Sequence, residues 1–214
     1  MKPKKIMTAL CIVSILCICH AAYSQSSNST DYSNSTVFGK GSNVLSLGIG
    51  LWGDYTYFGS GYTSSPNFVL SYDNGTFGDI GPGTISLGAL FSYKGIGYSY
   101  TDYHSGYYYN QNWSYYIIGL RSAYHLSIAT IPRFDPYVGI MLGYYDISYK
   151  ESSNDPYFDS PGNPYYGYYT NNYSSYFAFS LYIGARYFVT NHIGFWLELG
   201  YGYTDVALGI SFKL

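Results

Sequence analysis

The sequence IGFWLELGYGYTDVALGISFKL, residues 193–214, alternates between large apolar side chains and small or polar ones. Successive side chains on an extended backbone point to opposite faces, so this alternation predicts β-strands with one apolar face. The predicted apolar face consists of Ile193, Phe195, Leu197, Leu199, Tyr201, Tyr203, Val206, Leu208, Ile210, Phe212 and Leu214. The opposite face carries Gly194, Trp196, Glu198, Gly200, Gly202, Asp205, Ala207, Gly209, Ser211 and Lys213.

The small residues on the second face indicate where these strands lie. A soluble sheet would carry many charged side chains there to meet water, but this face is mostly Gly, Ala and Ser. Small residues suit the crowded interior of a narrow closed barrel, and an apolar stripe suits lipid acyl chains. A strand of about ten residues, tilted by about 40°, spans about 25 Å, the height of the apolar band in such barrels.

The same alternation recurs upstream. Further strands are expected at residues 43–52, 67–73, 84–100, 112–128, 135–149 and 174–189. Together with the two strands in 193–214, they predict an all-β fold, an eight-stranded antiparallel up-and-down transmembrane β-barrel with both ends on one side. Turns are expected on that side at 74–83, 129–134 and 190–192. On the other side we expect loops at 53–66, 101–111 and 150–173, and a very short connection near Thr204.

The N-terminus has the pattern of a secretory signal. Three lysines precede an apolar run over residues 6–19, and Ala22-Tyr23-Ser24 follows, which predicts cleavage before Gln25. We therefore expect a signal peptide at 1–24, a flexible Ser/Asn-rich periplasmic leader at 25–42 and the barrel domain at 43–214. All three cysteines lie within 1–24, so the mature chain has no thiol chemistry or disulfide. No later segment approaches the roughly 18 apolar residues of a transmembrane helix.

Charge and histidine placement exclude further classes of function. Removal of the signal leaves seven basic against twelve acidic residues, so we expect no nucleic acid partner. The mature histidines, His104, His125 and His192, are far apart in the sequence, so we predict no metal site and no cofactor.

The Gly-aromatic texture of the strands resembles a known family. It includes the segments Asp135-Pro136-Tyr137-Val138-Gly139 and Glu198-Leu199-Gly200-Tyr201-Gly202, and the apolar C-terminal strand. With these features, residues 43–214 resemble the small outer-membrane β-barrel domain proteins of Gram-negative bacteria, such as OmpX, OmpW and the OmpA membrane domain. The family's terminal aromatic residue is displaced here, because Phe212 is third from the end.

The resemblance implies a bacterial outer-membrane location, with the N- and C-termini periplasmic. Outer-membrane lipid and the barrel assembly machinery, which reads the C-terminal strand, are the expected partners. We expect a monomer.

Several charged residues fall on the inward register. They are Arg121, His125, Arg186, Glu198 and Lys213. Charges inside a barrel must be paired or hydrated, so we predict a packing network in which Glu198 balances the arginines or Lys213 and fills the lumen. The alternative is a narrow solute channel lined by the same charges.

A second alternative is enzymatic. His125 and Ser127 lie two apart on one strand face, an H-x-S pair like that of barrels that deacylate lipid A, and Asp135 lies across the following turn. Their inward position on the periplasmic side argues against a lipid A-modifying hydrolase, so we predict no catalytic residue. A third alternative is a secreted, lipocalin-like ligand carrier, in which the apolar stripe would line a cavity.

The longest predicted outside loop is rich in aromatic residues. They include Tyr157, Phe158, Tyr165, Tyr166, Tyr168 and Tyr169, among Asn, Ser, Gly and Pro. Tyrosine gives contact area at low entropy cost, which is typical of recognition surfaces, although the strands could also simply continue above the membrane. The sequence thus predicts a non-enzymatic outer-membrane barrel with a structural or surface-recognition role, and a glycan or host-surface ligand for this loop.

Overall fold

The computed structural model describes residues 37–51, 60–127, 131, 133–158 and 175–214. Its strands are β1 (Asn43–Leu51), β2 (Tyr62–Ser64), β3 (Asn67–Ile80), β4 (Gly83–Thr101), β5 (Tyr108–Leu126), β6 (Phe134–Ser153), β7 (Tyr176–Phe188), β8 (Ile193–Tyr201) and β9 (Val206–Lys213). In this described part of the chain, no helix is long and apolar enough to cross a membrane.

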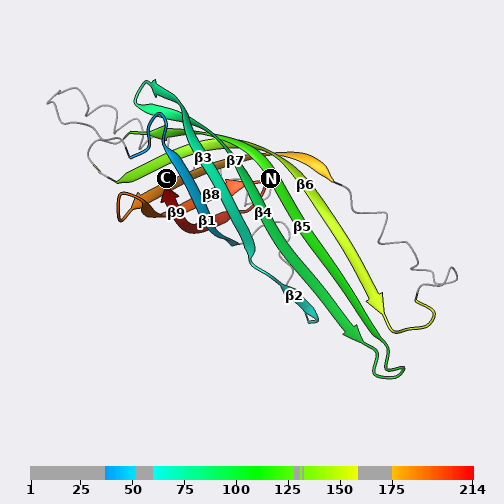
Figure 1. Cartoon of the computed structure of the whole chain (residues 1–214). Coiled ribbons are helices and arrows are strands. Elements are labelled where there is room, and N and C mark those ends of the chain that lie inside the picture. The colour runs from blue at the N-terminus through cyan, green and yellow to red at the C-terminus, as the bar shows by residue number, and fades with distance from the viewer. Residues whose placement is uncertain (1–36, 52–59, 128–130, 132, 159–174) are drawn as a thin grey trace, which may run out of the picture.

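All strands except β2 form a closed barrel. Each pairs in antiparallel fashion with its neighbour along the chain, and β1 pairs with β9 in the register Val44↔Lys213. The short strand β2 adds to the outer edge of β4. The prediction of an eight-stranded antiparallel up-and-down barrel is confirmed (Figure 1).

The outside of the barrel is apolar and its inside is polar. The exposed outward side chains include Leu47, Phe68, Leu70, Leu87, Phe91, Ile118, Leu120, Val138, Ile140, Leu142, Phe177, Phe179, Leu181, Phe195, Leu197, Leu199, Leu208 and Ile210. We call this band the lipid belt. Exposed to water, it would cost about 25 cal/mol per Å², so its solvent is lipid and the barrel is transmembrane. The lipocalin-like alternative required the apolar stripe inside and is therefore wrong.

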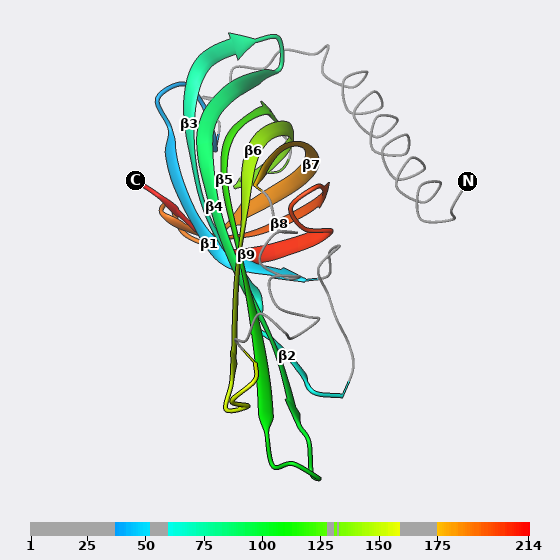
Figure 2. The ribbon, with the colours of Figure 1, turned by 90° about the vertical axis from the view of Figure 1, so that its right-hand side faces the viewer.

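Three strands are longer than a membrane requires. Strands β4, β5 and β6 have 19, 19 and 20 residues, where about ten span a bilayer. The barrel pairings β3 with β4 and β6 with β7 stop at Phe68↔Tyr93 and Tyr145↔Tyr176. Beyond these pairs β4, β5 and β6 continue as an open sheet, edged by β2 (Figure 2). We call this extension the blade; it comprises β2 and residues 94–101, 108–115 and 146–153.

Two connections are shorter than predicted. The expected loop 101–111 shrinks to residues 102–107, and the expected turn 74–83 shrinks to Gly81 and Pro82. These stretches are rich in Asn, Ser, Gly and Tyr, and this composition led us to predict loops there. Cross-strand pairing overrides that weak local preference.

The face of Tyr203 differs from the prediction. Strand β8 ends at Tyr201, and Gly202 adopts a φ of +122°, so the turn at 202–205 breaks the alternation. Tyr203 was predicted to face lipid, yet its side chain is buried in the lumen, while Asp205, predicted to face inward, is exposed in the turn.

Candidate functional site

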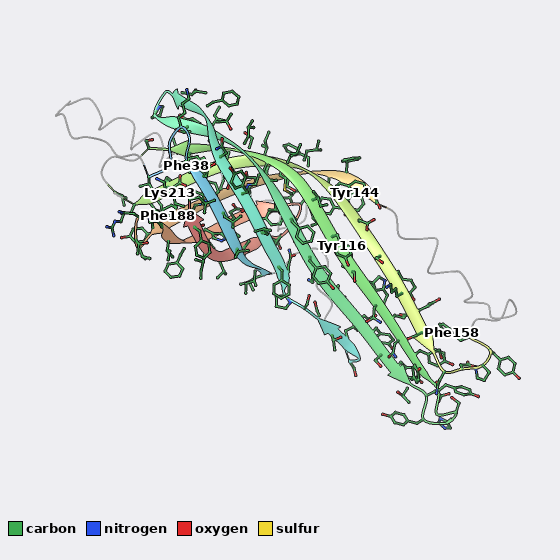
Figure 3. All side chains as sticks on the ribbon, in the orientation of Figure 1. Phe38, Tyr116, Tyr144, Phe158, Phe188 and Lys213 are labelled. Carbon is green, nitrogen blue, oxygen red and sulfur yellow. The ribbon has the colours of Figure 1, made fainter. Side chains whose placement is uncertain are left out.

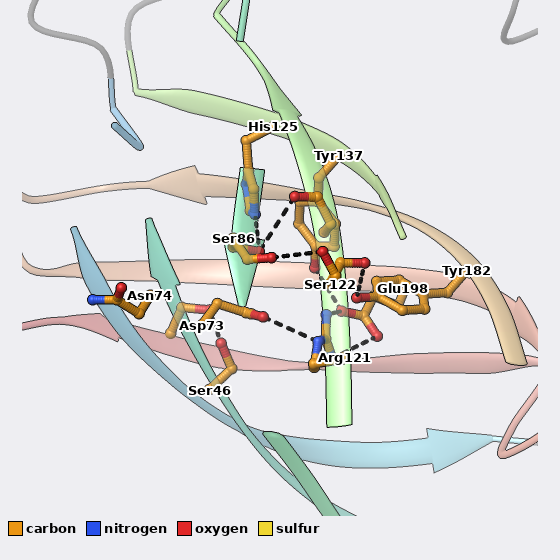
Figure 4. Close-up of polar contacts among 12 residues, drawn as sticks. Ser46, Asp73, Asn74, Ser86, Arg121, Ser122, His125, Tyr137, Tyr182 and Glu198 are labelled. Atoms are coloured by element: carbon orange, nitrogen blue, oxygen red, sulfur yellow. Dashed lines mark hydrogen bonds and ion pairs between the residues drawn. The ribbon is translucent and has the colours of Figure 1, made fainter. Parts of the chain in front are cut away.

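Six titratable side chains are buried together in the lumen. They are Asp73 on β3, Arg121 and His125 on β5, Asp135 on β6, Arg186 on β7 and Glu198 on β8, and each is at most 3% exposed. Strand pleating points alternate residues inward, so β5 supplies two of the six and β3, β6, β7 and β8 supply one each. Figure 4 shows Asp73, Arg121, His125 and Glu198 of this group.

Arg121 joins two carboxylates from different strands. Its Nη2 donates to Glu198 Oε1 over 2.6 Å, and its Nε lies 3.1 Å from Asp73 Oδ1. The guanidinium also lies over the Tyr182 ring, 4.3 Å from the centroid. A guanidinium has donors on several sides, so it can form ion pairs with both carboxylates at once.

Arg186 extends this chain of charges. Its Nη2 donates to Asp73 Oδ2, and its Nη1 donates to Asp135 Oδ2 over 3.3 Å. Asp73 therefore lies between the two arginines, and the charges alternate in sign from Glu198 to Asp135. We call this series, with His125 at its end, the lumen network. Alternation gives every buried charge an opposite neighbour, which burial requires.

Tyrosines complete the coordination of Glu198. The Tyr137 hydroxyl donates to Oε1 over 2.8 Å, and the Tyr203 hydroxyl donates to Oε2 over 2.6 Å. With the Arg121 bond, both carboxylate oxygens are satisfied without water. The lumen at this level is filled with side chains.

His125 connects the network to a serine. Its Nδ1 lies 2.7 Å from Asp135 Oδ1, and its Nε2 lies 3.1 Å from Ser86 Oγ. The hydroxyl partner is therefore Ser86 on β4, whereas Ser127 lies past the end of β5 and is exposed. Ser86, His125 and Asp135 thus contact one another in series, as the serine, histidine and aspartate of a hydrolase triad do. All three side chains are buried, however, so no substrate reaches Ser86 in this conformation.

Residues 37–42, which we expected in the flexible leader, pack against the end of the barrel that carries the C-terminus. Phe38 is buried and stacks on His125 with ring centroids 3.8 Å apart. Lys213 does not join the lumen network, because its Nζ donates to the carbonyl oxygen of Val37 over 2.7 Å. Figure 3 places Phe38 and Lys213 at one end of the molecule and Phe158 at the other. The segment therefore packs on the lumen network at this end of the barrel.

The tip of the blade carries exposed aromatic side chains. Tyr103 is 94% exposed and Tyr157 is 74% exposed. Beside them the Tyr109 hydroxyl donates to Asp155 Oδ2 over 2.8 Å, and this bond raises the pKa of Tyr109. The Tyr109 ring lies 5.9 Å from that of Phe158. The other predicted loop aromatics, Tyr165, Tyr166, Tyr168 and Tyr169, lie outside the described residues.

The sequence did not reveal several members of these sites. Asp73 and Ser86 lie on the inward register of their strands, so the alternation of inward and outward side chains, applied to every residue, would have identified them. Tyr203 was assigned to the wrong face, and Phe38 lies in a segment with no periodicity. Among the described residues, no group of three or more His, Cys, Asp and Glu side chains could hold a metal ion.

Comparisons with known proteins give structural similarity only. No family model matches this sequence, and no curated protein matches it. Solved structures similar to this chain include the outer membrane protein OprG of Pseudomonas aeruginosa, with 12% identity, a TM-score of 0.48, and coverage of 83% of this chain and 97% of that one.

Two further similar structures are the N-terminal β-barrel domain of Pseudomonas aeruginosa OprF and Ail, the attachment invasion locus protein of Yersinia pestis. They share 14% and 11% identity, with TM-scores of 0.41 and 0.37. Each covers 82% of this chain, and the matches span 99% of the OprF domain and 95% of Ail. Identities this low show a similar fold alone. The closure and register of this chain itself make it an eight-stranded transmembrane β-barrel.

Proposed function

We propose that this chain is a non-enzymatic integral protein of the bacterial outer membrane that recognises ligands outside the cell through its blade. One observation carries the proposal: the lumen is filled by buried, mutually paired charges, while β4, β5 and β6 extend far beyond the barrel. The blade, which lies outside the lumen, is therefore the part of the molecule that offers a surface to a ligand.

The filled lumen argues against a solute channel. A channel needs a hydrated path, but Arg121, Arg186 and Glu198 are each at most 3% exposed and bind one another or Asp73. Opening a path would separate buried opposite charges, which is strongly unfavourable. The hydrolase alternative needs access to Ser86, and the burial of that serine disfavours it.

The lengths of the connections support one orientation. At the end that carries residue 37 and the C-terminus, the barrel strands are joined by two, seven and four residues. At the other end the connections are 15 residues, which include β2, then six, 22 and four. Outer-membrane barrels have short periplasmic turns and longer extracellular loops. The termini then lie in the periplasm and the blade points out of the cell. Strand β9, with Leu208 and Ile210 exposed, is the segment that the assembly machinery would read.

The blade tip supports recognition rather than a purely structural role. Tyrosines as exposed as Tyr103 and Tyr157 offer large contact areas with little conformational entropy to lose, and Asn154 and Ser105 nearby are exposed polar residues. Such a mixture fits a glycan or another hydroxyl-rich surface outside the cell. We expect the protein to act as a monomer.

The location is tested on an outer-membrane fraction, run on a denaturing gel with and without boiling. An intact barrel resists detergent until heated, so we expect the protein in this fraction with a heat-dependent change in mobility. A protein found in the soluble fraction, with unchanged mobility, would contradict the outer-membrane assignment.

Recognition is tested with cells that display the protein, incubated with glycan arrays and host cells. We expect the double variant Tyr103→Ser/Tyr157→Ser and the deletion of residues 155–170 to lose binding. The control is Phe77→Ser, which removes an exposed aromatic side chain from β3 near the turn that joins it to β4. Binding that survives both blade variants would show that the tip is not the recognition surface.

A further inference from the structure

The outward face of the blade continues the lipid belt but has a different chemistry. On β4, β5 and β6 this face carries Phe91, Ile118 and Tyr144 at the level of the belt. The next pair is Tyr93 and Tyr116, whose rings lie 5.2 Å apart. Aromatic girdles mark the edges of the hydrocarbon layer in such barrels, so the membrane surface lies at this pair.

Beyond the girdle the same face is neutral and polar. Its cross-strand rows, from β4 through β5 to β6, are Gly95, Ser114 and Ser148; then Gly97, Asn112 and Lys150; then Ser99, Asn110 and Ser152. Because directly paired residues share a face, β2 and the residue after it add Thr63 beside Gly97 and Ser65 beside Gly95. We call this set the polar face.

The polar face is accessible to solvent, although Asn110, Ser114 and Ser148 are half-buried. Asn112, Lys150 and Ser152 are exposed, and the Ser99 hydroxyl donates to Asn110 Oδ1 over 2.7 Å, which orients that amide. A Cβ at Gly97 would lie 2.8 Å from Thr63 Oγ1 and 3.3 Å from Asn112 Oδ1, so the glycine leaves these two side chains room beside each other. The result is an array of amide and hydroxyl groups that can both donate and accept hydrogen bonds.

The charge on this face favours a neutral ligand. Lys150 is the only cation in the described rows above the girdle, and Asp146, in the girdle row, accepts from Ser175 Oγ over 2.6 Å. Phosphate recognition uses clustered basic side chains, in particular arginines that bind it bidentately. The polar face has no arginine, whereas a sugar chain presents the hydroxyls that amides and hydroxyls bind.

The opposite face of the blade is built differently. It carries Trp113 and Tyr149, whose rings lie 5.3 Å apart, and Ile96 is buried there. Only the polar face lies directly above the lipid belt. Eight residues of strand beyond the girdle extend about 26 Å, so this face runs alongside the head groups of the lipids whose acyl chains contact the belt.

We infer that the polar face binds the neutral oligosaccharide of the glycolipids in the leaflet that surrounds the blade. The acyl chains of such a glycolipid contact the lipid belt, and its sugars hydrogen-bond to Asn110, Asn112 and the serines above. This inference rests on the proposed outer-membrane location and is independent of recognition at the blade tip.

The test uses the full mature chain in phosphatidylcholine nanodiscs, with lipid-free oligosaccharide released from the outer-membrane glycolipid. Saturation-transfer NMR detects sugar protons that contact the protein. We expect transfer in the wild type and its loss, to background, in Asn110→Ala/Asn112→Ala. The matched control is Gln111→Ala, which changes the residue between them on the opposite face and should keep the full signal. The heat-dependent gel shift verifies that each barrel is folded, and Ser114→Ala/Ser148→Ala replaces the first variant if it does not fold.

The outcomes separate this inference from its alternatives. No transfer in the wild type, or equal transfer in the wild type and both asparagine and glutamine variants, overturns it. Binding that requires phosphorylated sugar and disappears in Lys150→Ala assigns a phosphate contact instead, and also overturns it. Tyr103→Ser/Tyr157→Ser should leave sugar transfer unchanged, so failure of tip recognition and failure of the polar face are distinguishable.

Discussion

Replacement of Glu198 by glutamine should destabilise the barrel without opening it. The change keeps the shape of the side chain and removes one charge beside Arg121, whose Nη2 lies 2.6 Å from Glu198 Oε1. Two unit charges about 4 Å apart attract by about 4 kcal/mol at an effective dielectric constant of about 20. Glutamine costs less to bury, and Asp73 still pairs with Arg121. We therefore expect a loss of about 3 kcal/mol, at the lower end of the range for a broken buried pair.

The assay is equilibrium unfolding by guanidinium in lipid vesicles, together with planar-bilayer recordings. Tyr203→Phe is the matched control, because it removes one hydrogen bond to Glu198 and leaves every charge in place. That variant should lose only about 1.5 kcal/mol. An unfolding free energy unchanged in Glu198→Gln, or a larger loss in Tyr203→Phe, would refute the role given to the charge. A large new current in Glu198→Gln would refute the filled lumen.

Three further changes test other parts of the molecule. Phe38→Ala should lower the free energy of unfolding by about 3 kcal/mol, as for a buried aromatic side chain, and guanidinium unfolding measures it. Gly202→Ala should cost about 2 kcal/mol in the same assay, because φ is +122° and the new Cβ would meet Ser180. The His104 amide and the Ser105 hydroxyl donate to Asp102, which lowers its pKa. Order in the β4–β5 turn should therefore persist at neutral pH and be lost only as the pH falls through that lowered pKa. The His104 amide resonance reports this loss, and Asp102→Ala should abolish its pH dependence.

The periodicity of the sequence was sufficient for the barrel because lipid and lumen impose opposite demands on alternate residues. In β8, Phe195, Leu197 and Leu199 face out and Trp196 and Glu198 face in, as predicted. Strand ends were less predictable. The blade strands carry Asn and Ser at outward positions where lipid no longer selects apolar residues, so their composition resembled that of a loop.

The partners within the lumen could not be derived from single strands. The alternation of side chains along each strand places Arg121 and Glu198 inside. However, β5 and β8 are not neighbours in the sheet, so no strand register relates the two residues. Their contact depends on the barrel diameter and on long side chains that cross the axis. The contact of Phe38 with His125 was still harder to predict, because a single aromatic residue in a Ser- and Asn-rich leader belongs to no periodic pattern.

The charges in the lumen are best understood through the unfolded chain rather than the folded one. A well-packed apolar lumen could be as stable as the lumen network, because paired buried charges often gain nothing over hydrophobic residues of similar volume. Apolar residues at the inward positions of β8, however, would make residues 193–201 one continuous apolar run. Such a run has high β-propensity and no charge, which makes an exposed unfolded segment prone to aggregate. On the proposed route to the outer membrane, the chain would cross the periplasm before insertion and be exposed in this way. The inward charges interrupt every strand that carries them, and the alternation that keeps the unfolded chain soluble then leaves opposite charges to meet when the barrel closes.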